Sequence, residues 1–119
     1  MKILFLDDDN YRFSLFKREN PNVDVDWAID YETGVNYVRN NDYDVIYLDH
    51  DLGWYEPTGK DFVNYMIKNK IPAKLVICHS MNPVGRENMV SMLSSYGYNV
   101  INRPFAWTHS TNDIFSSAI

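Results

Sequence analysis

Two acidic clusters follow two short apolar segments of this 119-residue chain. Three consecutive aspartates, at positions 7–9, follow KILFL, and Asp49, His50 and Asp51 follow DVIYL. Carboxylates this close together repel one another and are stabilised by a bound cation. Oxygen ligands favour Mg²⁺ or Mn²⁺ over softer metal ions. The two clusters therefore predict a divalent-metal site.

Two more apolar segments end in residues that can transfer a proton or bind phosphate. His79 and Ser80 follow KLVIC, Asn82 lies two residues further on, and Arg103 follows YNVIN. An imidazole titrates near neutral pH and can donate or accept a proton. Serine and asparagine can donate hydrogen bonds to phosphate oxygens, and a guanidinium can bind two oxygens of one phosphate. An acidic pocket edged by such groups suits a metal ion together with a phosphate.

Apolar segments alternate five times with helical patterns along the chain. Strands are predicted over residues 2–7, 23–28, 44–49, 74–78 and 98–102. Helices are predicted over residues 10–19, 31–39, 60–69 and 86–96, with a short weak one over 112–117. This order is typical of an α/β fold, a three-layer doubly wound five-stranded parallel sheet with helices on both faces. In such a sheet the carboxyl ends of the strands converge on one crevice.

Composition narrows the functional classes. The length suits a single domain over residues 1–119. The net charge of −5, with no cluster of Lys and Arg, argues against a nucleic-acid polymer as partner. No segment is apolar enough to span a bilayer, and the chain enters a strand at Lys2, so we expect neither a membrane anchor nor a signal peptide. The single cysteine, Cys78, lies in an apolar strand, which predicts a core residue and a cytoplasmic protein.

Several motifs resemble the receiver domains of bacterial response regulators over essentially the whole chain. Asp7 and Asp8 are similar to the acidic metal pair of receivers, and Asp49 lies where receivers carry their phosphoacceptor aspartate. Gly59 and the segment Arg103-Pro104-Phe105 are similar to the loop before the third helix and to the Lys-Pro-Phe segment. The resemblance implies a flavodoxin-like sheet with strand order 2-1-3-4-5.

The departures from receivers point to one branch of these proteins. His79 replaces the receiver Thr or Ser, Arg103 replaces the Lys, and His50 and Asp51 replace apolar residues. The motifs LDHDLG, TG and HSMNPVG, with Met89 downstream, resemble the cyclic-phosphate processing receiver family of phages and bacteria. That family is named for a predicted activity on small cyclic phosphates. The resemblance therefore implies a small cyclic-phosphate or nucleotide ligand and the cytoplasm of a bacterial or phage-infected cell.

We therefore predict a metal-dependent phosphodiesterase-type hydrolase that opens a cyclic nucleotide or an ADP-ribose cyclic phosphate. The predicted ligands of Mg²⁺ or Mn²⁺ are Asp7, Asp8, Asp49 and Asp51. The predicted catalytic groups are Asp49, His79 and His50, and the predicted substrate contacts are Arg103, Ser80 and Asn82. Water or Asp49 would attack phosphorus, and an imidazole would protonate the leaving oxygen.

Each candidate also has a purely structural interpretation. Asp9 can cap the first helix, and His79 can be a satisfied core histidine. Arg103 can form an ion pair with Asp7 or Asp8 instead of binding phosphate. Trp54 and Tyr55 can stack on a nucleobase or pack over the sheet edge.

Three alternative functions use the same residues. A stand-alone receiver would accept a phosphoryl group on Asp49, and a binding protein would sequester a cyclic nucleotide without turnover. The spacing of Asp7 and Asp9 is similar to the nucleophile motif of haloacid-dehalogenase-type phosphatases, but the chain is short for that fold and its cap.

Overall fold

The computed structural model describes residues 1–52 and 57–104. The predicted helix over residues 112–117 and the aromatic pair Trp54 and Tyr55 lie outside these ranges. No helix within them has the length and hydropathy that a bilayer span requires.

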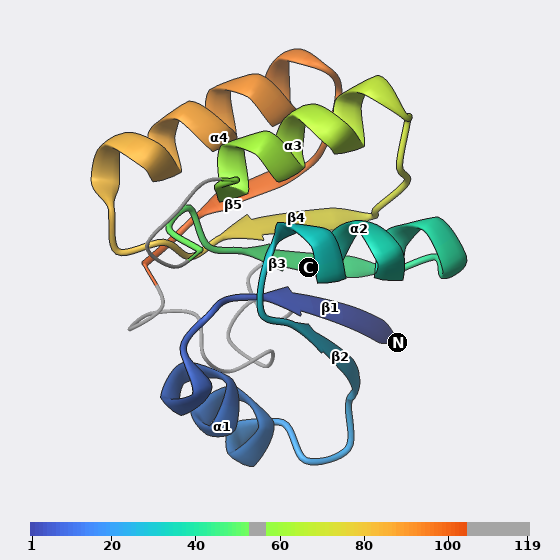
Figure 1. Cartoon of the computed structure of the whole chain (residues 1–119), viewed down its shortest axis with the longest axis vertical. Coiled ribbons are helices and arrows are strands. Elements are labelled where there is room, and N and C mark those ends of the chain that lie inside the picture. Colours follow the sequence, from blue (N-terminus) through green and yellow to red (C-terminus); the bar gives the residue numbers. More distant parts are fainter. Residues whose placement is uncertain (53–56, 105–119) are drawn as a thin grey trace.

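Five parallel strands form one sheet in the order β2-β1-β3-β4-β5 (Figure 1). The strands are β1 (Lys2–Leu6), β2 (Asp24–Ala28), β3 (Val45–Leu48), β4 (Leu75–Cys78) and β5 (Val100–Asn102). The predicted fold class and strand order are confirmed. Apolar and acidic residues alternate along β2, which suits its place at one edge of the sheet.

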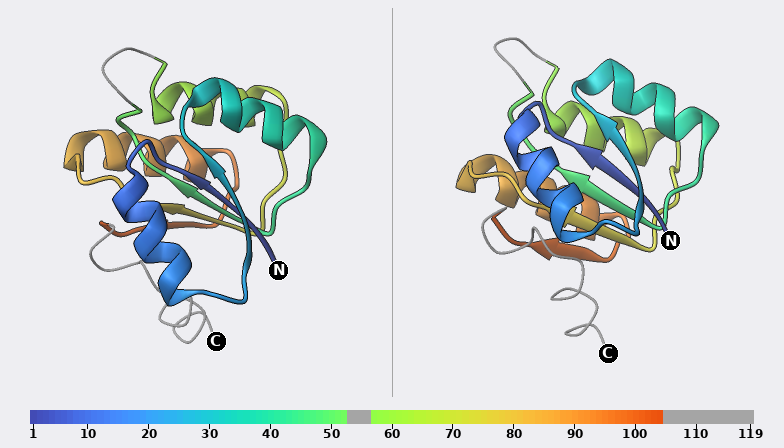
Figure 2. Two further views of the ribbon diagram at one scale, coloured as in Figure 1. Left: turned by 60° about the horizontal axis from the view of Figure 1, so that its bottom comes forward. Right: turned by 90° about the horizontal axis from the view of Figure 1, so that it is seen from below.

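Within residues 1–52 and 57–104, four helices cover the two faces of the sheet. They are α1 (Asn10–Glu19), α2 (Tyr31–Asn40), α3 (Gly59–Lys68) and α4 (Pro83–Ser95). Figures 1 and 2 show α1 on one face and α2, α3 and α4 together on the other. The fold therefore has three layers, with the sheet between two layers of helices, as the doubly wound pattern predicts.

Side chains that alternate along the strands build two separate cores. Leu4 and Leu6 of β1 pack in the core under α2, α3 and α4. Ile3 and Phe5, which alternate with these two leucines in the sequence, pack with Phe16 of α1 in the second core. Cys78 belongs to the first core, where burial raises the pKa of its thiol to about 12, so it is the core residue that the sequence predicted.

Side-chain caps fix where the helices begin. Asp9 accepts hydrogen bonds from the backbone N–H groups of Tyr11 and Arg12, which confirms it as the cap of α1. Asn82 caps α4 by accepting from the Gly85 N–H, so α4 begins three residues before the predicted residue 86. Pro83 suits this first turn because it lacks the N–H that a first turn leaves unpaired.

Two glycines let α3 and α4 pack directly on the loop that follows β3. A Cβ atom at Gly59 would lie 1.9 Å from the Asp49 carbonyl oxygen, and one at Gly85 would lie 2.4 Å from Cγ of His50. The Gly59 N–H also donates to the His50 carbonyl at 2.7 Å. The backbone of Asp49 is thus held from the α3 side.

We expect Gly59→Ala to lower the free energy of unfolding by at least about 2 kcal/mol, since a methyl group there overlaps rigid backbone. Urea denaturation followed by circular dichroism measures this change. The control is Lys60→Ala, at the next, exposed residue of the same helix. A Gly59→Ala protein as stable as the control would show that α3 does not press on the Asp49 loop.

Candidate functional site

Four strands end side by side, which places the residues after them in one row. The last paired residues are Leu6, Leu48, Cys78 and Asn102. The next residues are Asp7, Asp49, His79 and Arg103. The backbone N–H groups of the last three donate to carbonyls of the neighbouring strand at 2.9–3.1 Å. Because side chains alternate along a strand, these four positions share the α1 face of the sheet.

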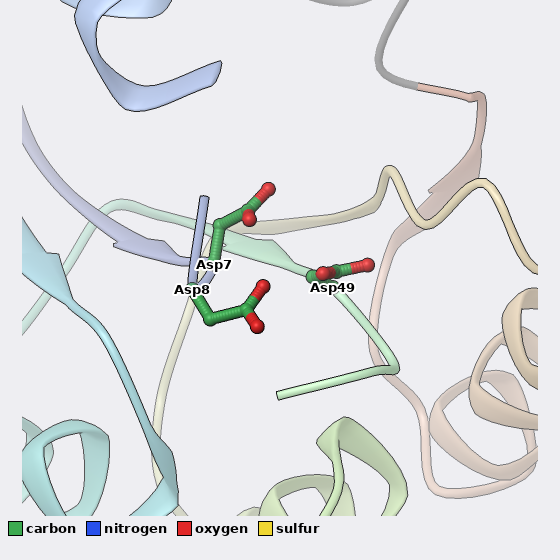
Figure 3. A group of neighbouring side chains, drawn as sticks. All are labelled: Asp7, Asp8 and Asp49. Atoms are coloured by element: carbon green, nitrogen blue, oxygen red, sulfur yellow. The ribbon is translucent and has the colours of Figure 1, made fainter. Parts of the chain in front are cut away.

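Three of the predicted metal ligands come together at the ends of β1 and β3. Asp7, Asp8 and Asp49 each offer one carboxylate oxygen, and these oxygens lie within 4.8 Å of one another (Figure 3). Asp7 and Asp49 are buried, whereas the side chain of Asp8 is 36% exposed. The cluster therefore opens to solvent on the Asp8 side.

Arg12 of α1 is a site residue that the sequence analysis missed. Its Nε and Nη2 atoms donate to the two carboxylate oxygens of Asp7, each at 2.8 Å, and Nη2 also lies 3.4 Å from Asp49 Oδ2. A sequence signal was available in its position, since Arg12 lies in the first turn of the helix predicted directly after the three aspartates. Arg12 thus forms the ion pair with Asp7 that the sequence offered as an alternative role for Arg103.

His79 lies in the site but is almost completely enclosed. Its Nε2 atom is 2.8 Å from Asp7 Oδ2, and the side chain is 1% exposed. The imidazole stacks on Phe5 with the ring centroids 5.0 Å apart. This histidine is therefore both a buried core residue and a neighbour of the carboxylate cluster. Its role as a proton donor to a ligand stays a prediction.

The side chain of His50 packs against α4 and pairs with Asp51. The Nδ1 atom of His50 lies 2.9 Å from Asp51 Oδ1, and the ring packs against Gly85. The side chain of Asp51 is 64% exposed, and its carboxylate is not part of the three-carboxylate group found among residues 1–52 and 57–104. The backbone N–H of His50, however, donates to Asp49 Oδ1 at 3.0 Å. The metal role predicted for Asp51 and the catalytic role predicted for His50 stay predictions.

The three predicted phosphate contacts occupy different positions. Ser80 is 1% exposed, and its side chain lies close enough to Asp49 to work against the raised pKa of that carboxyl. Asn82 directs its Oδ1 atom to the Gly85 N–H as the helix cap and donates its own backbone N–H to Ser80 Oγ at 3.1 Å. Arg103 is partly buried at the end of β5, next in the row to His79. Phosphate binding by these three residues stays a prediction.

Burial and hydrogen bonds act in opposite directions on the two buried carboxylates. Burial raises the pKa of Asp7, but hydrogen bonds from His79 and Arg12 outweigh it and hold the pKa below its ordinary value. Burial, helped by the charge of Asp7, raises the pKa of Asp49 to about 6 against the opposing effects of His79 and Arg12. Burial also raises the pKa of Asp8. Neighbouring donors therefore fully offset the cost of burying the Asp7 carboxylate, but they offset the cost of burying the Asp49 carboxylate only in part.

The residues present fit a divalent metal ion. The three carboxylates of Asp7, Asp8 and Asp49 supply the hard oxygen donors that Mg²⁺ and Mn²⁺ prefer. The guanidinium of Arg12 already lies among these oxygens, which shows that the cluster attracts a cation. The predicted ligands Asp7, Asp8 and Asp49 thus form one donor set.

The chain belongs to the cyclic-phosphate processing receiver domain family, whose model matches residues 2–95. The expected family is therefore confirmed. No curated protein matches the chain.

Solved receiver structures share the fold at low identity. The signal receiver domain of a Vibrio parahaemolyticus protein has a TM-score of 0.74 and 17% identity, covering 98% of this chain and 85% of that one. The response regulator TrrA from Thermotoga maritima has a TM-score of 0.71 and 21% identity, covering 99% and 98%. The HemR receiver domain from Leptospira biflexa has a TM-score of 0.66 and 21% identity, covering 98% and 90%. These structures support the receiver fold.

The opposite pKa shifts predict opposite effects of two isosteric substitutions. We expect Asp7→Asn to lower the free energy of unfolding at neutral pH by about 2 kcal/mol or more, because Arg12 and His79 lose their anionic partner. We expect Asp49→Asn to raise it by about 1–2 kcal/mol, because an undercompensated buried charge is removed. Urea denaturation of both variants without added metal measures the two changes.

Asp8→Asn is the matched control, since its carboxylate is the most exposed of the three and its loss should change stability by less than about 1 kcal/mol. Changes of the same sign in Asp7→Asn and Asp49→Asn would contradict the assigned charge balance.

Proposed function

We propose that this protein is a receiver-type, metal-dependent phosphoryl acceptor with Asp49 as the phosphorylated residue. The observation that carries the proposal is the grouping of Asp7, Asp8 and Asp49 at the ends of two central strands. Family membership and the receiver fold support it.

The proposed reaction uses Asp49 as a nucleophile. A carboxylate oxygen of Asp49 attacks the phosphorus of a small phosphodonor, the bond to the donor's leaving oxygen breaks, and an acyl phosphate forms. Mg²⁺ or Mn²⁺ held by the three carboxylates would offset the negative charge of the phosphoryl oxygens. Ser80 and Arg103 are the proposed hydrogen-bond donors to those oxygens. The similar Thermotoga maritima response regulator is described in complex with Mg²⁺-BeF, a phosphoryl-like group, which supports this assignment.

Treatment with acetyl phosphate and Mg²⁺ tests the proposal. We expect the intact mass to increase by one phosphoryl group, and we expect peptide mapping after borohydride reduction to locate it on Asp49. Asp49→Asn should abolish the modification, whereas Asp51→Asn, which removes an exposed carboxylate two residues away, should retain it. Equal labelling of wild type and Asp49→Asn would refute the assignment.

A second candidate is the opening of a small cyclic phosphate, such as a cyclic nucleotide or ADP-ribose cyclic phosphate. The pairing of His79 Nε2 with Asp7 Oδ2 at 2.8 Å favours it, because it places a proton donor beside the metal-binding carboxylates. His79 is 1% exposed, so proton transfer to a ligand requires the imidazole to leave Asp7. That requirement ranks this candidate below phosphorylation of Asp49.

A mass-spectrometric screen of cyclic phosphates with Mn²⁺ tests the second candidate. If it is correct, a substrate gains one water with wild type, and His79→Gln lowers turnover at least about tenfold. His50→Gln is the comparison variant, because the His50 side chain faces Asp51 and Gly85 instead of Asp7; a loss of turnover in His50→Gln but not in His79→Gln would assign the proton transfer to His50. Recovery of unchanged ligand from the denatured protein would instead identify a binding protein. The absence of both product and bound ligand across the panel would remove the second candidate.

A further inference from the structure

We infer that Arg12 is an intrinsic competitor of the metal ion, whose guanidinium occupies the cation position and must be displaced before a divalent ion binds. This inference rests on the proposed function, because it concerns how the metal site of that function is loaded.

One nitrogen of Arg12 lies at the point where the three carboxylates converge. Its Nη2 atom is 2.8 Å from Asp7 Oδ1, 3.4 Å from Asp49 Oδ2 and 3.8 Å from Asp8 Oδ1. Mg²⁺ binds carboxylate oxygens at about 2.0–2.1 Å, so it would need the volume that Nη2 fills. The metal ion and the guanidinium therefore exclude each other from the centre of the site.

Asp7 has no spare acceptor position for a metal ion. Its Oδ1 accepts from the Asp9 backbone N–H at 2.9 Å and from Arg12 Nη2 at 2.8 Å. Its Oδ2 lies 2.8 Å from both Arg12 Nε and His79 Nε2. A carboxylate offers about four lone-pair sites, and these four contacts use them all. A metal ion that binds Asp7 must therefore replace one of the present partners.

Arg12 is the partner that can leave at the lowest cost. The Asp9 N–H belongs to the backbone that begins α1, and His79 is enclosed between core side chains at 1% exposure. The Arg12 side chain is 25% exposed, and a long flexible stem joins its guanidinium to the first turn of α1. It can swing into solvent without moving the sheet or the helix. The affinity for metal thus includes the cost of breaking the two hydrogen bonds between Arg12 and Asp7.

Metal titration of an Arg12 variant tests this competition. We expect Arg12→Gln to bind Mn²⁺ at least about tenfold more tightly than wild type, because it removes both the charge and the paired donors. Isothermal titration calorimetry, together with the electron paramagnetic resonance signal of free Mn²⁺, measures the affinity. The control is Arg18→Gln, which removes the same charge from an exposed position of the same helix. Arg12→Lys, which keeps the charge but loses the paired donors, should lie between wild type and Arg12→Gln.

Nuclear magnetic resonance follows the displaced group itself. In metal-free wild type the Nε–H of Arg12 is hydrogen-bonded to Asp7 and should give a protected resonance. Saturating Mg²⁺ should shift this resonance and increase its exchange with water, without unfolding the protein.

Three outcomes separate the inference from the function beneath it. Tighter Mn²⁺ binding by Arg12→Gln, but not by Arg18→Gln, supports the competition. Binding by all proteins with no gain in Arg12→Gln, or with an Arg12 Nε–H that remains protected in Mg²⁺, overturns the competition and leaves the metal site intact. Failure of every variant and of wild type to bind Mn²⁺ overturns the competition and the proposed function together.

Discussion

The buried carboxylate of Asp7 is the constraint on which the site depends. A charge with no solvent exposure at the end of a central strand is stable only when the protein supplies compensating donors. Arg12 supplies two of these donors from α1, and His79 supplies one from the position directly after β4. The first helix and two strands are therefore tied together through one side chain, in addition to their apolar packing.

The same compensation leaves the neighbouring Asp49 charge only partly balanced. Arg12 is closer to Asp7 than to Asp49, and the two carboxylates raise the cost of ionising each other. A site with a deficit of positive charge is poised to accept a cation, and a bound cation in turn makes an anionic phosphoryl group acceptable. The buried charge of Asp49 thus lowers the stability of the fold, and the same charge is the basis for the proposed binding of a cation and a phosphoryl group.

Sequence patterns determined the framework and the row of acidic residues. The alternation of apolar strands and helical segments predicted the layers, and the resemblance to receivers implied the strand order that is observed. The end of each apolar segment located Asp7, Asp49 and His79, because residues that follow parallel strands meet at one edge. The predicted beginning of α4 at residue 86 is three residues too late, because Pro83 is compatible with a first helical turn and begins the helix.

Only the tertiary structure decided which of these groups touch. The sequence did not predict the contact between Arg12 and Asp7. This contact depends on the direction in which α1 leaves β1, which a sequence pattern does not contain. His79 and His50 look equivalent in the sequence, yet one faces Asp7 and the other packs on Gly85. Strand register and the alternation of side chains make this choice, because successive residues at a strand end point to opposite faces of the sheet. The sequence alone therefore determined the kinds of groups at the site, and the fold determined their partners.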